Sequence, residues 1–268
     1  MDLLLKPSAI SRKEMGMNVQ VKKFGQWLIS LTGVVILWSL FANSGFISQD
    51  LFPTPGQVWA AAVELYIDGV LVSDLKISMK RAAIGFSIGA SLGILVGLLT
   101  ARVKFITIAL EPFLNLLRPI PAIALVPIAI VWFGIGEGFK YFVISYTVFL
   151  AVWLNTHAGA SEVASTYIRA ARSLGASKFR EFFEVVIPAA APHIVVGLRL
   201  GTALAFLSLV AAELSGASSG IGFRLQDARQ FMRTDRMFVG LIELGILGAT
   251  LDAVFVYFSK RIVHWENA

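Results

Sequence analysis

Long apolar stretches constrain this chain more than any other feature of its sequence. Six of them lie at residues 25–49, 82–101, 119–136, 141–161, 185–212 and 237–259; the first four hold no charged residue, and the last two hold isolated charges. Each is long enough, alone or with its flank, for the roughly 20 residues with which a helix crosses the hydrocarbon core of a bilayer. The sequence therefore predicts an all-α integral membrane protein with six transmembrane helices.

The composition excludes several other classes of protein. Hydrophobic residues make up 57% of the chain and charged residues 15%, against about 25% charged residues in soluble domains, and the mean hydropathy is +0.76. A soluble fold could not hide so much apolar surface behind so few charges, and a disordered chain would not carry 20 Phe and 6 Trp. The absence of Cys excludes disulfides, thiol catalysis, iron–sulfur clusters and thiolate zinc sites. The net charge of +6 comes from basic residues scattered between apolar stretches, so we expect membrane lipid around the protein and no nucleic-acid partner.

Two of the predicted spans have unusual surroundings. A basic leader precedes the first span, whose apolar run is too long for the core of a signal peptide, so we expect the leader to be retained. The third span is interrupted by prolines, which disturb a helix, and we expect it to enter the membrane near Ile106 or Glu111. These prolines are Pro112, Pro119, Pro121 and Pro127.

The distribution of basic residues predicts the orientation in the membrane. If both termini are cytoplasmic, the inner segments hold 13 of the 23 Lys and Arg residues, the outer segments hold 8, and Arg118 and Arg199 lie inside spans. Excess positive charge on the cytoplasmic side is the usual pattern, although Lys76, Lys80 and Arg81 fall on the outer side. We therefore expect a cytoplasmic leader at 1–24, a membrane domain at 25–260 and a cytoplasmic tail at 261–268.

A polar insert between the fourth and fifth spans, residues 158–188, has the pattern of two short amphipathic helices. Gly175 separates them, because glycine readily takes the left-handed conformation that ends a helix, and Ser177 is a candidate N-cap for the second helix. Two interpretations stay open: helices that lie on lipid headgroups, or a rigid knob that fits a groove on a partner protein. Their apolar residues at helical spacing are Val163, Tyr167, Ala170, Ala171 and Leu174, then Phe179, Phe182, Phe183 and Val186.

The spacing within this insert resembles a known family. Arg169-Ala170-Ala171, three residues, Gly175, nine residues and Val185-Val186-Ile187-Pro188 are similar to the E-A-A-x3-G-x9-I-x-L-P loop of ABC importer permeases. Arg169 replaces the first Glu of that pattern. The resemblance implies a cytoplasmic loop that docks on an ATPase subunit. The residues that it implicates in coupling are Arg169, Ala170, Ala171, Leu174, Gly175, Phe179, Phe183 and Pro188.

A second set of segments extends the resemblance over nearly the whole chain. These segments are similar to the nitrate, sulfonate, taurine and bicarbonate branch of the same permeases, which implies a type I ABC importer permease of the bacterial inner membrane. The implied partners are two ATPase subunits carrying MgATP, a second permease copy in a homodimer, and an extracytoplasmic solute-binding protein. The segments are Leu51-Phe52-Pro53-Thr54-Pro55, Arg118-Pro119-Ile120-Pro121, Trp132-Phe133-Gly134-Ile135-Gly136-Glu137, Ala212-Glu213-Leu214, Gly220-Ile221-Gly222 and Trp265.

The chain has no phosphate-binding loop of its own. Such a loop needs glycine-rich backbone followed by Lys and then Ser or Thr, and none of the ten lysines precedes either residue. We therefore expect that this chain is not an enzyme, binds no cofactor, and depends on a separate ATPase to drive alternating access.

Charged residues inside the predicted spans point to the path of a solute, because an unpaired charge in hydrocarbon costs several kcal/mol. Arg118, Arg199 and Asp252 lie at comparable depth, roughly 10 to 16 Å from the cytoplasmic ends at about 1.5 Å per residue. Either Asp252 forms a structural ion pair with one arginine, or the arginines attract an anionic or zwitterionic solute. The prolines favour the third span as a cavity wall, with the fifth facing it, because freed carbonyls need protein or water beside them. The candidate path residues are Arg118, Pro119, Pro121, Arg199, Glu213 and Asp252.

Gly85, Gly89, Gly93 and Gly97 share one face of the second span. Small residues at this spacing let helices approach closely in lipid. We expect this face to pack against another helix of the same chain, with dimerisation as the alternative.

Two other functions are weaker alternatives. An ion-coupled secondary transporter or channel would use intramembrane charges such as Arg199 and Asp252, but it does not explain the insert. A hydrolase would use Ser218 in Gly216-Ala217-Ser218-Ser219-Gly220, but that pattern needs a strand before the serine, and here it follows a predicted span. His157, His193 and His264 lack partners at metal-ligand spacing, so we expect ordinary polar roles for them.

Overall fold

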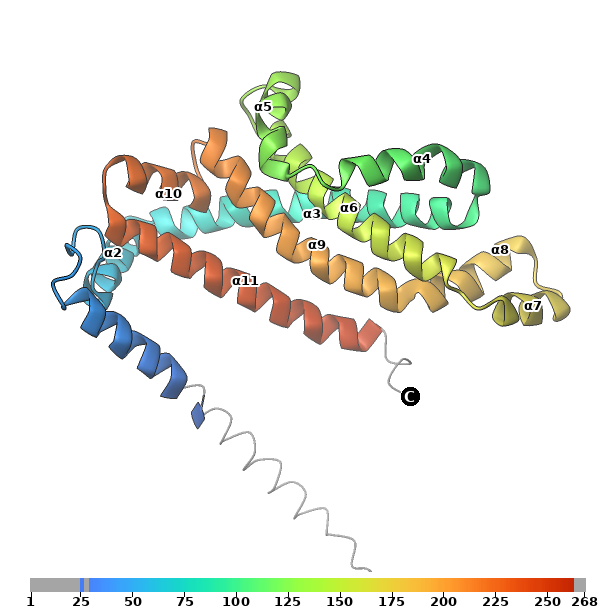
Figure 1. Ribbon diagram of the computed structural model, residues 1–268, viewed down its shortest axis with the longest axis horizontal. Coiled ribbons are helices and arrows are strands. Elements are labelled where there is room, and N and C mark those ends of the chain that lie inside the picture. The colour runs from blue at the N-terminus through green and yellow to red at the C-terminus, as the bar shows by residue number, and fades with distance from the viewer. Residues whose placement is uncertain (1–24, 27–28, 263–268) are drawn as a thin grey trace, which may run out of the picture.

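The computed structural model describes residues 25–26 and 29–262, which include no β-strand. The predicted leader at 1–24, together with His264 and Trp265, lies outside these residues. An N-terminal helix, Ile29–Ala42, comes first (Figure 1). It is followed by α2 (Pro55–Ile67), α3 (Val70–Arg102), α4 (Lys104–Leu117), α5 (Ala122–Phe133), α6 (Gly138–Ser161), α7 (Ser165–Ser173), α8 (Lys178–Arg180), a π-helical turn (Glu181–Val186), α9 (Ile187–Gly216), α10 (Ile221–Gln230) and α11 (Thr234–Ile262).

Helices α3, α6 and α9 form the core, with α6 in the middle. A Cβ atom added to Gly89 of α3 would lie 2.5 Å from the backbone oxygen of Ser145, and one on Gly97 would lie 2.6 Å from Thr156 Cβ, both on α6. On the other side of α6, a Cβ on Gly197 of α9 would lie 2.8 Å from Asn155 Cβ. The glycine face of the second predicted span therefore packs within the chain, and this expectation is confirmed.

The second predicted span begins earlier than the sequence suggested. We placed it at 82–101, but α3 starts at Val70 and runs for 33 residues. The apolar stretch 82–101 lies within α3, and the helix continues before it through charged residues. Asp74 and Arg81 are instead inside α3 and buried, with ionic partners on other helices.

The third predicted span is broken into two helices. Helices α4 and α5 meet at a bend of 106°, between Leu117 and Ala122, where Pro119 and Pro121 stand. Among the described residues, four other helices are long and apolar enough to cross a membrane, and the count is five if the bent pair forms one span. The N-terminal helix ends at Ala42, before the end of the 25–49 span that we predicted, and the sixth span stays a prediction.

The start of α10 is held by side chains from α3 and α9. The backbone N–H of Gly220 donates to Asp74 (2.8 Å), that of Ile221 to Ser78 (2.9 Å) and that of Gly222 to Glu213 (2.8 Å). The first N–H groups of a helix have no partner within the helix. These three side-chain oxygens therefore cap α10 and fix it to the core.

Ion pairs join the same end of the bundle, which we call the α10 end. The Arg81 guanidinium contacts Glu213 (2.8 Å) and Glu137 (2.7 Å), and Glu137 also accepts from Lys140 (2.9 Å). Arg224 of α10 lies 3.4 Å from Asp74 and also pairs with Glu243 of α11. Arg81, Lys140 and Arg224, which we counted in the outer segments, are buried in this cluster, and the orientation in the membrane stays a prediction.

Candidate functional site

The polar insert forms a compact helical corner at the end of the bundle opposite to α10, as Figure 1 shows for α7 and α8. Helix α7 ends in a Schellman motif: Ala176 N–H donates to the Ala171 carbonyl (3.0 Å) and Gly175 N–H to the Arg172 carbonyl (3.0 Å). Gly175 has φ +80°, a conformation that costs other residues energy. The Ala-Ala-x3-Gly spacing thus fixes how this helix ends.

The second helix of the insert begins as expected and then differs from the prediction. The Ser177 hydroxyl accepts from Arg180 N–H (3.3 Å), which confirms the N-cap. However, α8 and the π-helical turn continue into α9 and form one helix from Lys178 to Gly216. Pro188, in the first turn of α9, has no N–H to donate, and the wider π-helical turn directly before it accommodates that missing hydrogen bond.

The insert carries an exposed apolar surface, which we call the corner surface and define as Tyr167, Leu174, Phe179 and Phe183. Leu174 is 89% exposed and Phe179 is 71% exposed. The Phe179 and Phe183 rings lie 4.5 Å apart. Apolar side chains of this size gathered beside basic residues are typical of a contact surface. The exposed basic neighbours are Arg169, Lys178 and Arg180.

Glu181 lies beneath this corner and binds two arginines. Its carboxylate accepts from Arg172 of α7 (2.7 and 3.2 Å) and from Arg102 at the end of α3 (3.2 Å). Glu181 raises the pKa of Arg172, because the hydrogen bond and the negative charge favour the protonated guanidinium. Arg169, by contrast, is exposed and contacts only Thr166 at 3.5 Å. Glu181 was not among the residues predicted from the sequence, because its two arginine partners lie on α3 and α7 and come together only in the fold.

The broken span forms one wall of a cavity of about 330 Å³. Arg118 and Pro121 contribute from the bend between α4 and α5, Tyr146 and Thr147 from α6, and Leu200 from α9. Arg118 is exposed, and its side chain has no hydrogen bond or ion pair with the residues that the structure describes. The expected arrangement, with the third span facing the fifth across a cavity, is present in the fold, and Pro119 lies at the same bend.

The remaining candidate path residues lie elsewhere. Arg199 of α9 and Asp252 of α11 form a bidentate pair at 2.8 and 2.9 Å. Of the two arginines that could have paired with Asp252, the structure therefore selects Arg199. Glu213 is completely buried in the ion-pair cluster at the α10 end. Of the charged candidates, Arg118 alone lines the cavity beside the bend.

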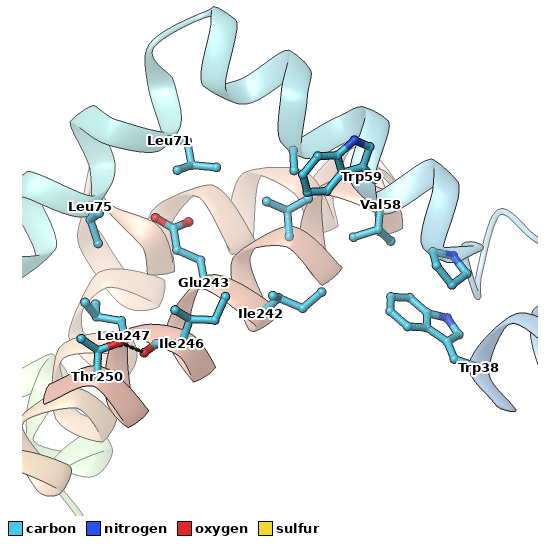
Figure 2. Close-up of a pocket in the computed structure, with 13 residues that line it drawn as sticks. Trp38, Val58, Trp59, Leu71, Leu75, Ile242, Glu243, Ile246, Leu247 and Thr250 are labelled. Atoms are coloured by element: carbon cyan, nitrogen blue, oxygen red, sulfur yellow. Dashed lines mark hydrogen bonds between the residues drawn. The ribbon is translucent and has the colours of Figure 1, made fainter. Parts of the chain in front are cut away.

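A larger groove of about 470 Å³ opens between the N-terminal helix, α2, α3 and α11 (Figure 2). Trp38, Trp59 and several aliphatic side chains line it. Glu243 is its one charged lining residue, and Figure 2 shows this carboxylate beside Leu71 and Leu75. Because Arg224 already pairs with Glu243, the groove suits hydrocarbon better than a polar solute.

The other predicted motifs do not form reactive sites. Ser218 lies in the turn after α9 rather than after a strand, as we expected. His157 bonds to Thr100 Oγ1 (2.9 Å), and His193 lies 4.0 Å from Glu162. Within the described residues, no group of three His, Asp or Glu side chains could hold a metal ion.

Comparison with known proteins decides the family. Residues 89–264 match the family model described as the binding-protein-dependent transport system inner membrane component. The chain belongs to this family. It is therefore a permease subunit of a multi-pass inner-membrane ABC importer, a system that also has ATPase subunits and a binding protein.

Curated relatives align over most of this permease. It is 36% identical to the putative aliphatic sulfonates transport permease protein SsuC of Bacillus subtilis over 250 residues, 92% of this chain and 90% of that one. It is 32% identical to the taurine transport system permease protein TauC of Escherichia coli (89% of this chain and 88% of that one). It is 33% identical to the nitrate import permease protein NrtB of Synechocystis (89% of each chain).

Solved structures share the fold at lower identity. An amino acid ABC transporter superposes on this permease with a TM-score of 0.56 at 17% identity, covering 76% of this chain and 97% of that one. An inward-facing structure of the methionine ABC transporter MetNI gives a TM-score of 0.55 at 19% identity, covering 79% and 98%. These matches support the all-helical type I importer architecture.

Proposed function

We propose that this permease carries a small anionic or zwitterionic solute of the sulfonate, taurine or nitrate class into the cytoplasm. The observation that supports this most directly is Arg118, a cation without a partner among the described residues, on the wall of the cavity beside the α4–α5 bend. A guanidinium suits sulfonate and nitrate oxygens, because its planar donors can bond two oxygens at once. The relatives named for sulfonates, taurine and nitrate support the same class of solute.

The corner surface is the docking site for the ATPase in this proposal. It is apolar and exposed, and it lies at one end of the bundle on a helix whose end is fixed by Gly175. Two ATPase subunits that hold MgATP dock on two permease copies, and nucleotide-driven closure of the ATPases moves the corners. The corner and both termini are then cytoplasmic, and the α10 end faces the extracytoplasmic binding protein.

A substitution at Arg118 tests the solute class. The assay is uptake of taurine, nitrate and methanesulfonate by the permease reconstituted in vesicles with its ATPase and with the binding protein that copurifies with it. We expect Arg118→Gln to reduce uptake about tenfold or more, the effect of losing one charged hydrogen bond, and Arg118→Lys to restore part of it. Arg261→Gln, at an exposed arginine near the end of α11 and away from both the cavity and the α10 end, is the control. Full uptake in Arg118→Gln would contradict the proposal.

Substitutions at the corner test the docking role. Gly175→Val forces a β-branched residue into the left-handed conformation, and Ala171→Glu places a charge one turn before it. We expect both to reduce copurification of the ATPase and uptake, while membrane insertion is unchanged. Gly248→Val is the control, because a Cβ there meets nothing within 4 Å. Unchanged ATPase association in both corner variants would refute docking at this surface.

A further inference from the structure

Helix α7 is attached to the rest of the permease with little apolar packing. None of its nine residues is buried. Its C-terminus is fixed by backbone hydrogen bonds to the turn at Gly175, but these bonds do not reach another helix. A helix that transmits force needs a stiffer connection to the spans than an exposed turn supplies.

Glu181 makes this connection through its side chain. Its carboxylate is 7% exposed and joins three elements: Arg172 on α7, Arg102 on the last turn of α3, and its own π-helical turn at the base of α9. The hydrogen bonds from Arg172 Nε and Nη2 form a fork on the two carboxylate oxygens, which fixes orientation as well as distance. π-Helical turns within longer helices are frequent at functional sites.

We propose that Glu181 is a positioning residue that makes α7, α3 and α9 move as one body, so that movement at the corner surface reaches the spans. This inference rests on the proposed docking of the ATPase at that surface.

Glu184 provides a matched control on the same helix. It lies one turn from Glu181, is 68% exposed, and its nearest cation, Arg180, is 4.0 Å away. An exposed pair of this kind contributes little. Glu184→Gln therefore changes the local charge by the same amount as Glu181→Gln without disconnecting α7 from α3.

The experiment uses the reconstituted complex of permease, ATPase and binding protein, with taurine, nitrate and methanesulfonate as probes. The chain has no native Cys, so spin labels at Ser173→Cys on α7 and Lys104→Cys beside the end of α3 report their separation. We expect Glu181→Gln to keep ATPase association, to broaden the label distance distribution, and to lower uptake per ATP hydrolysed on the order of tenfold. Glu184→Gln should behave as the unsubstituted complex.

A second substitution guards against a folding defect at the buried carboxylate. Arg172→Gln changes an exposed side chain and leaves Glu181 bonded to Arg102, so the spans fold normally, and we expect the same broadened distances and a smaller loss of uptake per ATP. If Glu181→Gln and Arg172→Gln keep narrow distances and full uptake per ATP, the positioning role is refuted while docking stands. If the unsubstituted permease does not hold the ATPase at all, docking is refuted and the positioning role with it.

Discussion

A close contact between two core helices, α3 and α6, gives a sharp test of the fold. The Gly89→Ala substitution adds one methyl group where α3 meets α6. That methyl would lie 2.5 Å from the Ser145 carbonyl oxygen and 2.8 Å from Val148 Cβ, both closer than van der Waals contact. Ser145 O belongs to the backbone, so it cannot rotate away as a side chain would, and the two helices must separate.

The expected magnitude follows from two opposing contributions. Alanine favours the helix over glycine by about 1 kcal/mol, whereas forcing a methyl group into a packed core costs about 2 to 3 kcal/mol when the neighbours cannot yield. We therefore expect Gly89→Ala to lower the free energy of unfolding by about 1 to 2 kcal/mol. The matched substitution Gly248→Ala on α11 meets nothing within 4 Å, so it should leave stability unchanged or raise it by up to about 1 kcal/mol.

The assay is equilibrium unfolding of the purified permease in detergent micelles, followed by tryptophan fluorescence. Trp153 of α6 is buried and donates to Thr100 Oγ1 of α3 (3.1 Å). In a background in which the other five Trp residues are replaced by Phe, its emission reports separation of these two helices. Equal stability of Gly89→Ala and Gly248→Ala would refute the close approach of α3 to α6.

Three further outcomes test the ion pairs. Glu213→Ala removes the completely buried partner of Arg81, and we expect it to lower the free energy of unfolding by about 3 kcal/mol. This value is near the lower end for a broken buried ion pair, because Glu137 still compensates the charge of Arg81. An unchanged unfolding midpoint would contradict this expectation. Asp252→Asn leaves Arg199 without its carboxylate, so less protein should reach the membrane fraction, and adding Arg199→Gln should restore the yield if the pair is structural. Hydrogen bonds from Arg81 hold the pKa of Glu137 at about 2, below its ordinary 4.5; its stabilisation is therefore present above about pH 4.5 and is lost as the pH falls toward 2. The stability difference between the unsubstituted protein and Glu137→Gln should follow that course, and a difference that peaks below pH 2 would be inconsistent with it.

The core contact could be predicted from the sequence because it depends on the spacing of residues along a single helix. Gly85, Gly89, Gly93 and Gly97 recur every four residues, so they share one helix face wherever that helix lies, and a close partner is then required by their size. The bend in the third span was equally local, since Pro119 and Pro121 remove backbone donors whatever surrounds them. The sequence therefore predicted both the close contact and the break without any knowledge of the partners.

Where a helix ends, and which residues form ion pairs, depends on residues far away in the chain. The sequence was less informative about both. Arg81 was expected outside the second span, because its partner Glu213 stands far along the chain on α9. The Arg199–Asp252 pair could be predicted only because the number of residues from each span end places both side chains at a similar depth in the membrane. Arg118 had the same depth by that count, and only the fold showed that it lines the cavity instead.

The burial of so many charges at the α10 end is possible because they nearly cancel. Four carboxylates face three cations. The carboxylates are those of Asp74, Glu137, Glu213 and Glu243, and the cations are Arg81, Lys140 and Arg224. The remaining negative charge meets the N-terminus of α10, which carries about half a positive charge, and the first N–H groups of that helix bond to Asp74 and Glu213 directly. Removing Asp74, Glu213 or Glu243 therefore does more than break a pair, since it also leaves a cation or a helix end uncompensated in a site with little water. The same cluster requires glycine at positions 220 and 222. A Cβ at these positions would lie 2.4 Å and 2.7 Å from Glu213 atoms, so only a residue without a side chain lets the α10 backbone come close enough to the carboxylate.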